Sequence, residues 1–214
     1  MTKLIRLLAS LFAVALVTAT PGFAADLEAG RDYTLIDPPL YTPKGKIEVI
    51  EFFSYACPHC KEFHPVLDAW AAKLPKDVVL RRVPITFRRL PWERLSRIYF
   101  ALEAMGQVDR LNGAVFKSLH EERFVINSDE AAIDWAVKHG LDGKKFGDML
   151  TSFSVQSKVQ QADQESASAK IQGVPALVVD GRWLINNQAA SGNADLLKRV
   201  DFLVAKARKE KKFK

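Results

Sequence analysis

Short apolar runs rich in β-branched and aromatic residues stand in the first part of the chain. They predict strands at 46–53 and 77–84, and a shorter edge strand at 33–40 that two prolines stop. Between the longer strands the spacing becomes helical, from the cysteine pair to about Leu74, with a kink expected at Pro65. Strand, crossover helix and strand at this spacing predict a βαβ unit with parallel strands.

The pattern then stays helical over a long stretch before strands return. Throughout 91–171, apolar residues recur three and four positions apart, and no run within it is typical of a strand. Strands are predicted at 176–179 and 182–186, joined by the two-residue turn Asp180-Gly181. A closing helix is expected from about Asn193. The strand-forming segments therefore lie at both ends of the chain, with helices between them.

The first 24 residues are expected to form a separate, removable unit. Lys3 and Arg6 precede an apolar run at 7–17, and small residues then lead to Ala24. This pattern is typical of a secretory signal peptide cleaved after Ala24. The alternative, a membrane anchor, needs about 20 apolar residues, and this run has 11. We therefore expect 1–24 to be cleaved and the mature chain to be exported.

The remaining length fits one domain that carries an insertion. We expect 25–90 and 172–214 to form the sheet-containing domain and 91–171 to form an inserted helical subdomain. The predicted fold class is thus α/β (α+β), and a hydrophobic fraction of 48% indicates a globular protein. The formal net charge of +6 is spread along the chain, without the recognition motif of a nucleic-acid-binding protein. No nucleic-acid partner is expected.

The chain contains two cysteines, and both lie in the stretch SYACPHCKEFH. A disulfide between Cys57 and Cys60 would close a very short loop, which removes little chain entropy and stabilises a chain of this size poorly. A structural zinc site needs four ligands, and only His59 and His64 stand near the pair. We expect no metal, and we expect His64 to lie on a helix surface.

The position of the pair favours redox chemistry instead. It stands where a strand ends and a helix begins, and Pro58 suits the first helical position, where no backbone N–H is needed. The Cys57 sulfur would then face unpaired N–H groups and the positive end of the helix dipole, with His59 beside it. We therefore expect Cys57 to be an exposed, low-pKa nucleophile and Cys60 a shielded resolving thiol. Their disulfide would be a good oxidant, because a stabilised thiolate favours the reduced form.

The stretch EFFSYACPHCKEFHP resembles the active site of the DsbA family of thiol:disulfide interchange proteins, within the thioredoxin superfamily. CPHC is a specific choice within CxxC, and Pro65 stands where the superfamily kinks its active-site helix. Gly173-Val174-Pro175 resembles the cis-proline loop that faces the cysteines. The signal peptide and the helical insertion match as well, so the resemblance covers nearly the whole mature chain. It implies a thioredoxin-like fold with an inserted α-helical subdomain.

The resemblance also assigns two further parts of the site. By itself Pro175 would be a trans proline at a strand start, but the family implies a cis bond that leaves the Val174 backbone able to bind an extended substrate. Glu51 matches a buried carboxylate beneath the cysteines, which would tune or relay the proton of Cys60. The residues alone leave other readings open for Glu51, namely a solvated carboxylate or a pair with Arg81 or Arg82.

The family resemblance implies a periplasmic protein disulfide oxidoreductase, a dithiol oxidase. It would donate its Cys57–Cys60 disulfide to unfolded exported proteins with free thiols, and a DsbB-like inner-membrane protein would reoxidise it. The resemblance also implies a monomer, and it implies no cofactor beyond the redox-active disulfide. The alternatives are a disulfide isomerase or reductase, and a non-enzymatic peptide-binding module, which would keep its activity without either cysteine.

Overall fold

The computed structural model describes residues 27–212, so the expected signal peptide and its cleavage after Ala24 lie outside the described residues. Within them, five strands form one mixed sheet in the order β1-β5-β4-β2-β3. The strands are β1 (Tyr33–Leu35), β2 (Ile47–Phe53), β3 (Val78–Pro84), β4 (Ala176–Val179) and β5 (Trp183–Ile185). Only β2 and β3 run parallel, as the βαβ prediction requires. The predicted edge strand is confirmed but is only three residues long.

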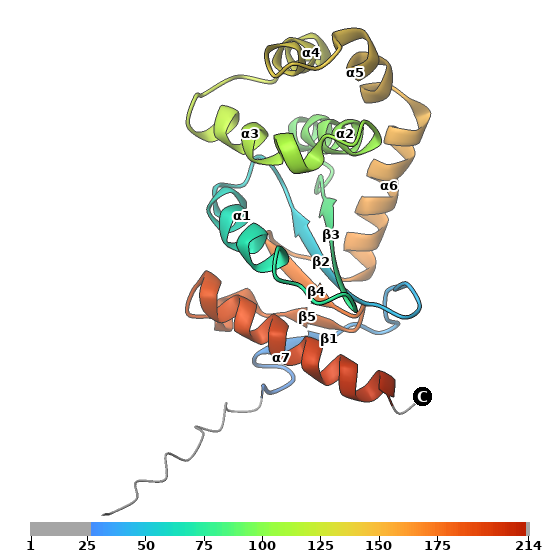
Figure 1. Ribbon diagram of the computed structural model, residues 1–214, viewed down its shortest axis with the longest axis vertical. Coiled ribbons are helices and arrows are strands. Elements are labelled where there is room, and N and C mark those ends of the chain that lie inside the picture. Colours follow the sequence, from blue (N-terminus) through green and yellow to red (C-terminus); the bar gives the residue numbers. More distant parts are fainter. Residues whose placement is uncertain (1–26, 213–214) are drawn as a thin grey trace, which may run out of the picture.

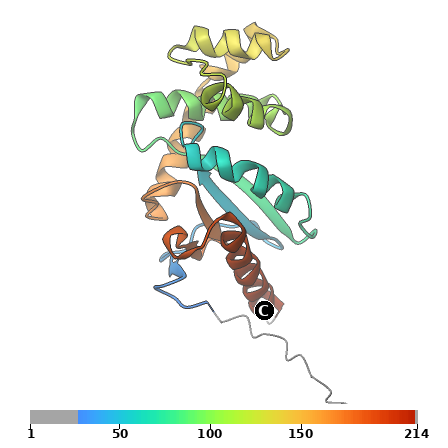
Figure 2. The same ribbon diagram turned by 90° about the vertical axis from the view of Figure 1, so that its left-hand side faces the viewer.

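Helices cover both faces of this sheet (Figure 1). They are α1 (Pro58–Ala71), α2 (Leu90–Ala104), α3 (Val108–His120), α4 (Asp129–Lys138), α5 (Gly143–Leu150), α6 (Phe153–Ser168) and α7 (Asn193–Lys212), with a 3-10 turn, η1 (Asn187–Ala189), before α7. Helices α1 and α7 pack on one face of the sheet, and α6 packs on the other. Helices α2 to α6 follow one another between β3 and β4; α2 to α5 gather at one end of the molecule, and α6 runs from there back along the sheet (Figures 1 and 2).

This arrangement confirms the predicted fold class, a thioredoxin-like sheet interrupted by inserted helices. The hairpin prediction is confirmed too, because Asp180 and Gly181 both have positive φ angles, 54° and 67°, as a two-residue turn of this kind requires. The boundaries of the inserted subdomain at 91–171 stay a prediction.

Strand β2 lies in the middle of the molecule and is buried along its whole length. It pairs with β3 on one side and β4 on the other, and helices cover both of its faces. Its apolar residues therefore contribute to both hydrophobic cores, while its two carboxylates, Glu48 and Glu51, are buried as well. Buried carboxylates need partners, and β3 supplies one arginine to each. The chain leaves the end of β2 at Phe53 and reaches the cysteine pair at the start of the next helix.

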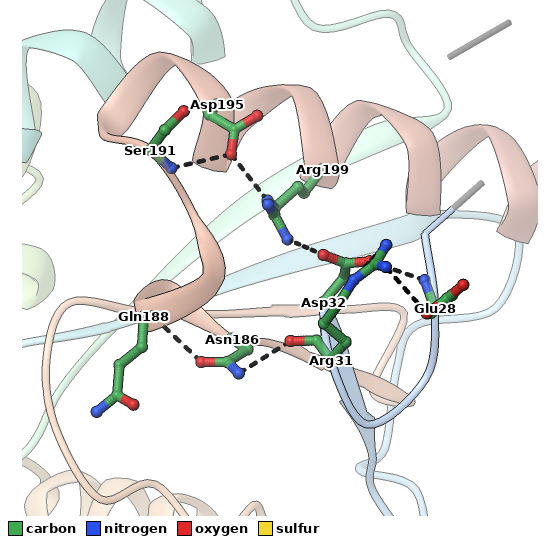
Figure 3. Close-up of polar contacts among 8 residues, drawn as sticks. All are labelled: Glu28, Arg31, Asp32, Asn186, Gln188, Ser191, Asp195 and Arg199. Carbon is green, nitrogen blue, oxygen red and sulfur yellow. Dashed lines mark hydrogen bonds and ion pairs between the residues drawn. The ribbon is translucent and has the colours of Figure 1, made fainter. Parts of the chain in front are cut away.

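A charged cluster joins the segment before β1 to α7 (Figure 3). The buried Asp32 carboxylate accepts hydrogen bonds from Arg31 at 2.7 Å, from the Glu28 backbone N–H at 2.9 Å and from Arg199 at 2.5 Å. Arg199 also donates to Asp195 on its own helix, at 3.0 Å. The donors Arg31, Glu28 and Arg199 hold the pKa of Asp32 well below its usual range.

An Asp32→Asn variant should therefore lose stability near neutral pH. Because the pKa of Asp32 is lower in the folded state, the contribution of its charge is present above the ordinary aspartate pKa of about 4 and is lost as the pH falls below that value. Urea unfolding at several pH values should show a gap between variant and wild type that narrows in acid. Asp134→Asn, at an exposed position of α4, is the control. A gap that stays constant with pH would mean that Asp32 acts through packing rather than charge.

Candidate active site

The two cysteines lie at the N-terminus of α1, directly after the buried strand β2. Cys57 is the N-cap residue with an extended backbone, and Pro58 occupies the first turn, as predicted. The backbone N–H groups of His59 and Cys60 lie in the first turn of the helix, where no earlier carbonyl accepts from them, and they donate to the Cys57 sulfur. The first turn contains no acidic residue that would oppose a negative charge there. The local sequence thus builds a site for a negative charge at this sulfur.

The two thiols have opposite acidities. The pKa of Cys57 is lowered to about 6, first by a hydrogen bond from the Cys60 thiol and then by the backbone N–H groups and the nearby His59 ring. Burial, the hydrogen bond to Cys57 and the carboxylate of Glu51 raise the pKa of Cys60 far above that of an ordinary thiol. Cys60 is fully buried, as expected, but the prediction that Cys57 is exposed is wrong, because only 8% of it is accessible and the Val174 carbonyl packs against its sulfur. In the reduced state above about pH 6, one proton therefore stays on Cys60 while Cys57 carries the negative charge.

The loop before β4 faces the Cys57 sulfur. The Val174–Pro175 peptide bond is cis, and the Val174 carbonyl lies 3.3 Å from Cys57 Sγ. A groove of about 940 Å³ begins beside this contact and is lined by His59, Val174 and Pro175 together with residues of β1, β5 and η1. Five of the predicted site residues, from two distant parts of the sequence, thus meet at one point. They are Cys57, Pro58, His59, Val174 and Pro175.

His59 itself stands in solvent at the edge of the groove. Its side chain is 80% exposed, and Nδ1 lies 3.4 Å from the carboxylate of Glu62 on the next turn of α1. The backbone N–H of His59 donates to the Cys57 sulfur, and the exposed ring acts on Cys57 only through its charge. Among residues 27–212, no group of three or more histidine, cysteine or acidic side chains is placed to hold a metal ion.

Glu51 lies beneath the cysteines and is 2% exposed. Arg82 on β3 donates from Nε to the Glu51 carboxylate at 3.1 Å, and its other end donates to Asp68 on α1. Burial raises the pKa of Glu51 to about 7, although Arg82 opposes this rise, and the charge of Asp68 adds to it. Glu51 is therefore both a paired carboxylate and a group that titrates near neutral pH.

The two arginines that the sequence left as alternatives point to opposite faces of the sheet. Arg82 lies opposite Glu51 in the parallel register of β2 and β3. Arg81 instead donates to Glu48 at 2.9 Å and to Glu165 of α6 at 2.6 Å. Strand alternation separates the two pairs, so only Arg82 can influence Glu51 by direct contact.

The prediction that His64 lies on a helix surface is wrong. Its side chain is 13% exposed, because α3 from the inserted helices packs against α1 at this point. The ring lies 3.4 Å from Asp68 and 3.4 Å from the side-chain amide of Asn112, and burial lowers the pKa of His64. Asp68 is a residue of this cluster that our sequence reasoning missed. The spacing carried a signal, since Cys60, His64 and Asp68 follow each other at four-residue intervals, on one side of the helix.

Comparisons with known proteins agree with this geometry. Residues 48–203 match the family model of the DSBA-like thioredoxin domain. The thiol:disulfide interchange protein DsbA of Bordetella pertussis is 41% identical over 204 residues, which cover 93% of this chain and 96% of the relative. The DsbA of Pseudomonas aeruginosa is 32% identical over 203 residues. A crystal structure of Pseudomonas aeruginosa DsbA superposes with a TM-score of 0.84, at 33% identity, over 88% of this chain and 98% of that chain.

Proposed function

The chain belongs to the DsbA-like thioredoxin family and is a disulfide oxidoreductase, and we propose that it oxidises protein thiols with the Cys57–Cys60 pair. One observation carries this assignment of residues. A thiol of lowered pKa lies 3.3 Å from the carbonyl of Val174, a residue that lines the groove, and a buried thiol of raised pKa lies behind it. Such a pair accepts electrons readily when oxidised, because its reduced form is stabilised.

The proposed reaction proceeds in two exchange steps. A substrate thiolate attacks Cys57 Sγ of the disulfide, and the Cys57–Cys60 bond breaks as a mixed disulfide forms between substrate and Cys57. Cys60 leaves as a thiolate and takes up a proton, which its raised pKa favours. A second substrate thiolate then attacks the substrate sulfur of the mixed disulfide, and Cys57 leaves as a stabilised thiolate. The substrate dithiol has lost two electrons, and the cysteine pair has gained them.

The Val174 backbone and the cis peptide bond at Pro175 are proposed to bind the substrate. An extended peptide can add to this point as a short strand, with hydrogen bonds to main-chain groups that do not depend on the substrate's side chains. That mode of binding suits an enzyme whose substrates share free thiols rather than a sequence. His59 and Pro58 help to stabilise the Cys57 thiolate, and Glu51, which lies beneath the cysteines, tunes or relays the proton of Cys60.

Partners and location follow from family membership. Proteins with thiols as substrates and a membrane partner for reoxidation are implied for a DsbA-type enzyme. The finer proposal is a periplasmic monomer, released by cleavage after Ala24, that acts on unfolded exported proteins and is reoxidised by a DsbB-like inner-membrane protein. Within the described part of the chain, no helix is long and apolar enough to cross a membrane.

Thiolate titration of the reduced protein tests the assignment of Cys57. The ultraviolet thiolate absorbance should rise with an inflection near the Cys57 pKa of about 6. At about pH 7 the thiolate would then outnumber the thiol by about ten to one, which stabilises the reduced form by roughly 1.4 kcal/mol, or about 30 mV, relative to a site with an ordinary thiol. Because the pKa is lowered, this gain is present at alkaline pH and is lost as the pH falls through about 6.

The redox equilibrium with glutathione should be measured on the same sample. An oxidising disulfide together with the low inflection supports the dithiol oxidase. An inflection near that of a free thiol, with a disulfide that is hard to reduce, would instead indicate a reductase. A disulfide of intermediate potential that reshuffles scrambled substrates would indicate an isomerase.

A further inference from the structure

Strand β4 extends beyond the end of its neighbour β5. The two strands pair Val178 with Leu184, and β5 ends at Ile185. Continuing this register would place Asn187 opposite Pro175, at a point where the backbone no longer forms a ladder. The β5-side edge of the chain at Pro175 would therefore be open to another strand, and the groove beside Cys57 runs along it.

The Asn187 side chain closes this open edge. Its Nδ2 group donates to the Pro175 carbonyl, in the place that a strand N–H would take. The other end of the same amide, Oδ1, is shielded from solvent and has no hydrogen-bond partner in the part of the chain that the structure describes. A shielded amide oxygen without a donor is unfavourable, so local stability alone does not explain why an asparagine is held in this orientation.

Contacts on both sides of Asn187 fix its position (Figure 3). Asn186 donates from its side chain to the Arg31 carbonyl at 2.9 Å and accepts from the Gln188 backbone N–H at 3.1 Å. After η1, the Ser191 backbone N–H donates to Asp195 at 3.1 Å, and Asp195 is joined through Arg199 to the buried Asp32. The charged cluster thus holds the segment that presents Asn187 to Pro175.

We propose that Asn187 is a specificity-determining residue that sets the register in which a substrate peptide pairs with the loop before β4. Neighbouring carbonyls of an extended chain point to opposite edges. The Val174 carbonyl lies against Cys57, where a bound cysteine can react, and the Pro175 carbonyl lies against Asn187. By occupying the Pro175 carbonyl, Asn187 prevents a peptide from adding along β4 on the side away from the sulfur. This inference rests on the proposed binding of substrate at Val174.

Single-turnover oxidation of a synthetic dithiol peptide by the fully oxidised protein tests the proposal. In Asn187→Ala the Pro175 carbonyl is free, so a peptide can also bind along β4 on the side away from the sulfur. A peptide bound in this second register does not react. The limiting rate and the half-saturating peptide concentration should then fall together, by roughly three- to tenfold, about the effect of one net hydrogen bond, while their ratio stays constant. Asn187→Asp, which has the same shape but cannot donate to the Pro175 carbonyl when ionised, should behave likewise.

Two controls separate this role from a merely structural one. Asn127→Ala, at an exposed position outside the groove, should match the wild type. The Cys57 thiolate titration and the glutathione equilibrium should be unchanged in Asn187→Ala, which adds no charge, because the amide acts on peptide register and not on the thiols. Unchanged kinetics, a higher half-saturating concentration at constant limiting rate, or a shifted Cys57 titration would overturn the proposal. If the wild type itself fails to oxidise the peptide, the proposed function fails instead.

Discussion

A Cys57→Ala variant is expected to oxidise a dithiol peptide no faster than buffer does, a loss of several orders of magnitude. Cys57 lies 3.3 Å from the carbonyl of Val174, which lines the groove, and its lowered pKa makes it the better leaving group in the proposed second exchange step. Cys60 cannot replace it, because that thiol is fully buried and its pKa is raised. Loss of thiols from the peptide, followed with a chromogenic thiol reagent, measures the rate.

The matched variant Cys60→Ala should fail in a different way. Its Cys57 can still form a mixed disulfide with glutathione, but no internal thiol is left to release the bound group, so the adduct should persist and be visible by mass. The pKa of Cys57 should also rise above about 6, since the Cys60 thiol is the main donor that lowers it. Binding of the peptide that continues without oxidation in both variants is compatible with the enzyme. A wild type that binds the peptide without oxidising it, with the same affinity as both variants, would instead identify a peptide-binding module.

Most of the framework of this site could be predicted from local sequence. The β-branched run of β2, proline at the start of α1 and the Asp180-Gly181 turn each have a local physical cause, and the structure has all three where they were expected. The low pKa of Cys57 was predictable for the same reason, because the helix N-terminus that stabilises the thiolate is made by adjacent residues.

The remaining features depend on contacts between distant segments. Whether Arg81 or Arg82 pairs with Glu51 is decided by the register of β2 against β3, and a shift by one residue would exchange the two arginines. The burial of His64 comes from α3, which is about 50 residues away along the chain and packs on α1. Likewise, Asn187 reaches Pro175 only because β5 ends before β4 does, and no local pattern fixes that difference in length.

A Glu51→Gln variant is expected to slow oxidation of the peptide by about a hundredfold below neutral pH, the lower part of what a positioned acid or base contributes. In the first step of the proposed reaction, substrate attacks Cys57 and Cys60 departs as a thiolate. Because Cys60 is buried and its pKa is raised, this thiolate needs a proton. Glu51, with a pKa of about 7, holds a proton for part of the time at neutral pH and lies close enough to influence Cys60. Glutamine fills the same space but has no proton to give.

The pH dependence separates this role from a change of shape. The ratio of wild-type to variant rates cancels the ionisation of the substrate thiol, and it should fall towards one as the pH rises through about 7, where Glu51 loses its proton. Glu48→Gln is the matched control, since Glu48 is a buried carboxylate of the same strand that pairs with Arg81 on the opposite face. Its ratio should not change between pH values on either side of about 7. A Glu51→Gln ratio that is equally independent of pH would remove Glu51 from the proton transfer.

Stability should respond to the same ionisation with a definite sign. The pKa of Glu51 rises on folding from 4.5 to about 7, so its favourable contribution is complete below about pH 4.5 and is lost as the pH rises through about 7. Above that range the wild type carries the unfavourable free energy of a buried carboxylate, and Glu51→Gln should be more stable by about 3 kcal/mol in urea unfolding. The difference should disappear in acid. A variant that is less stable at alkaline pH would mean that the Arg82 pair outweighs desolvation, and Glu51 would then be retained for structure rather than for its proton.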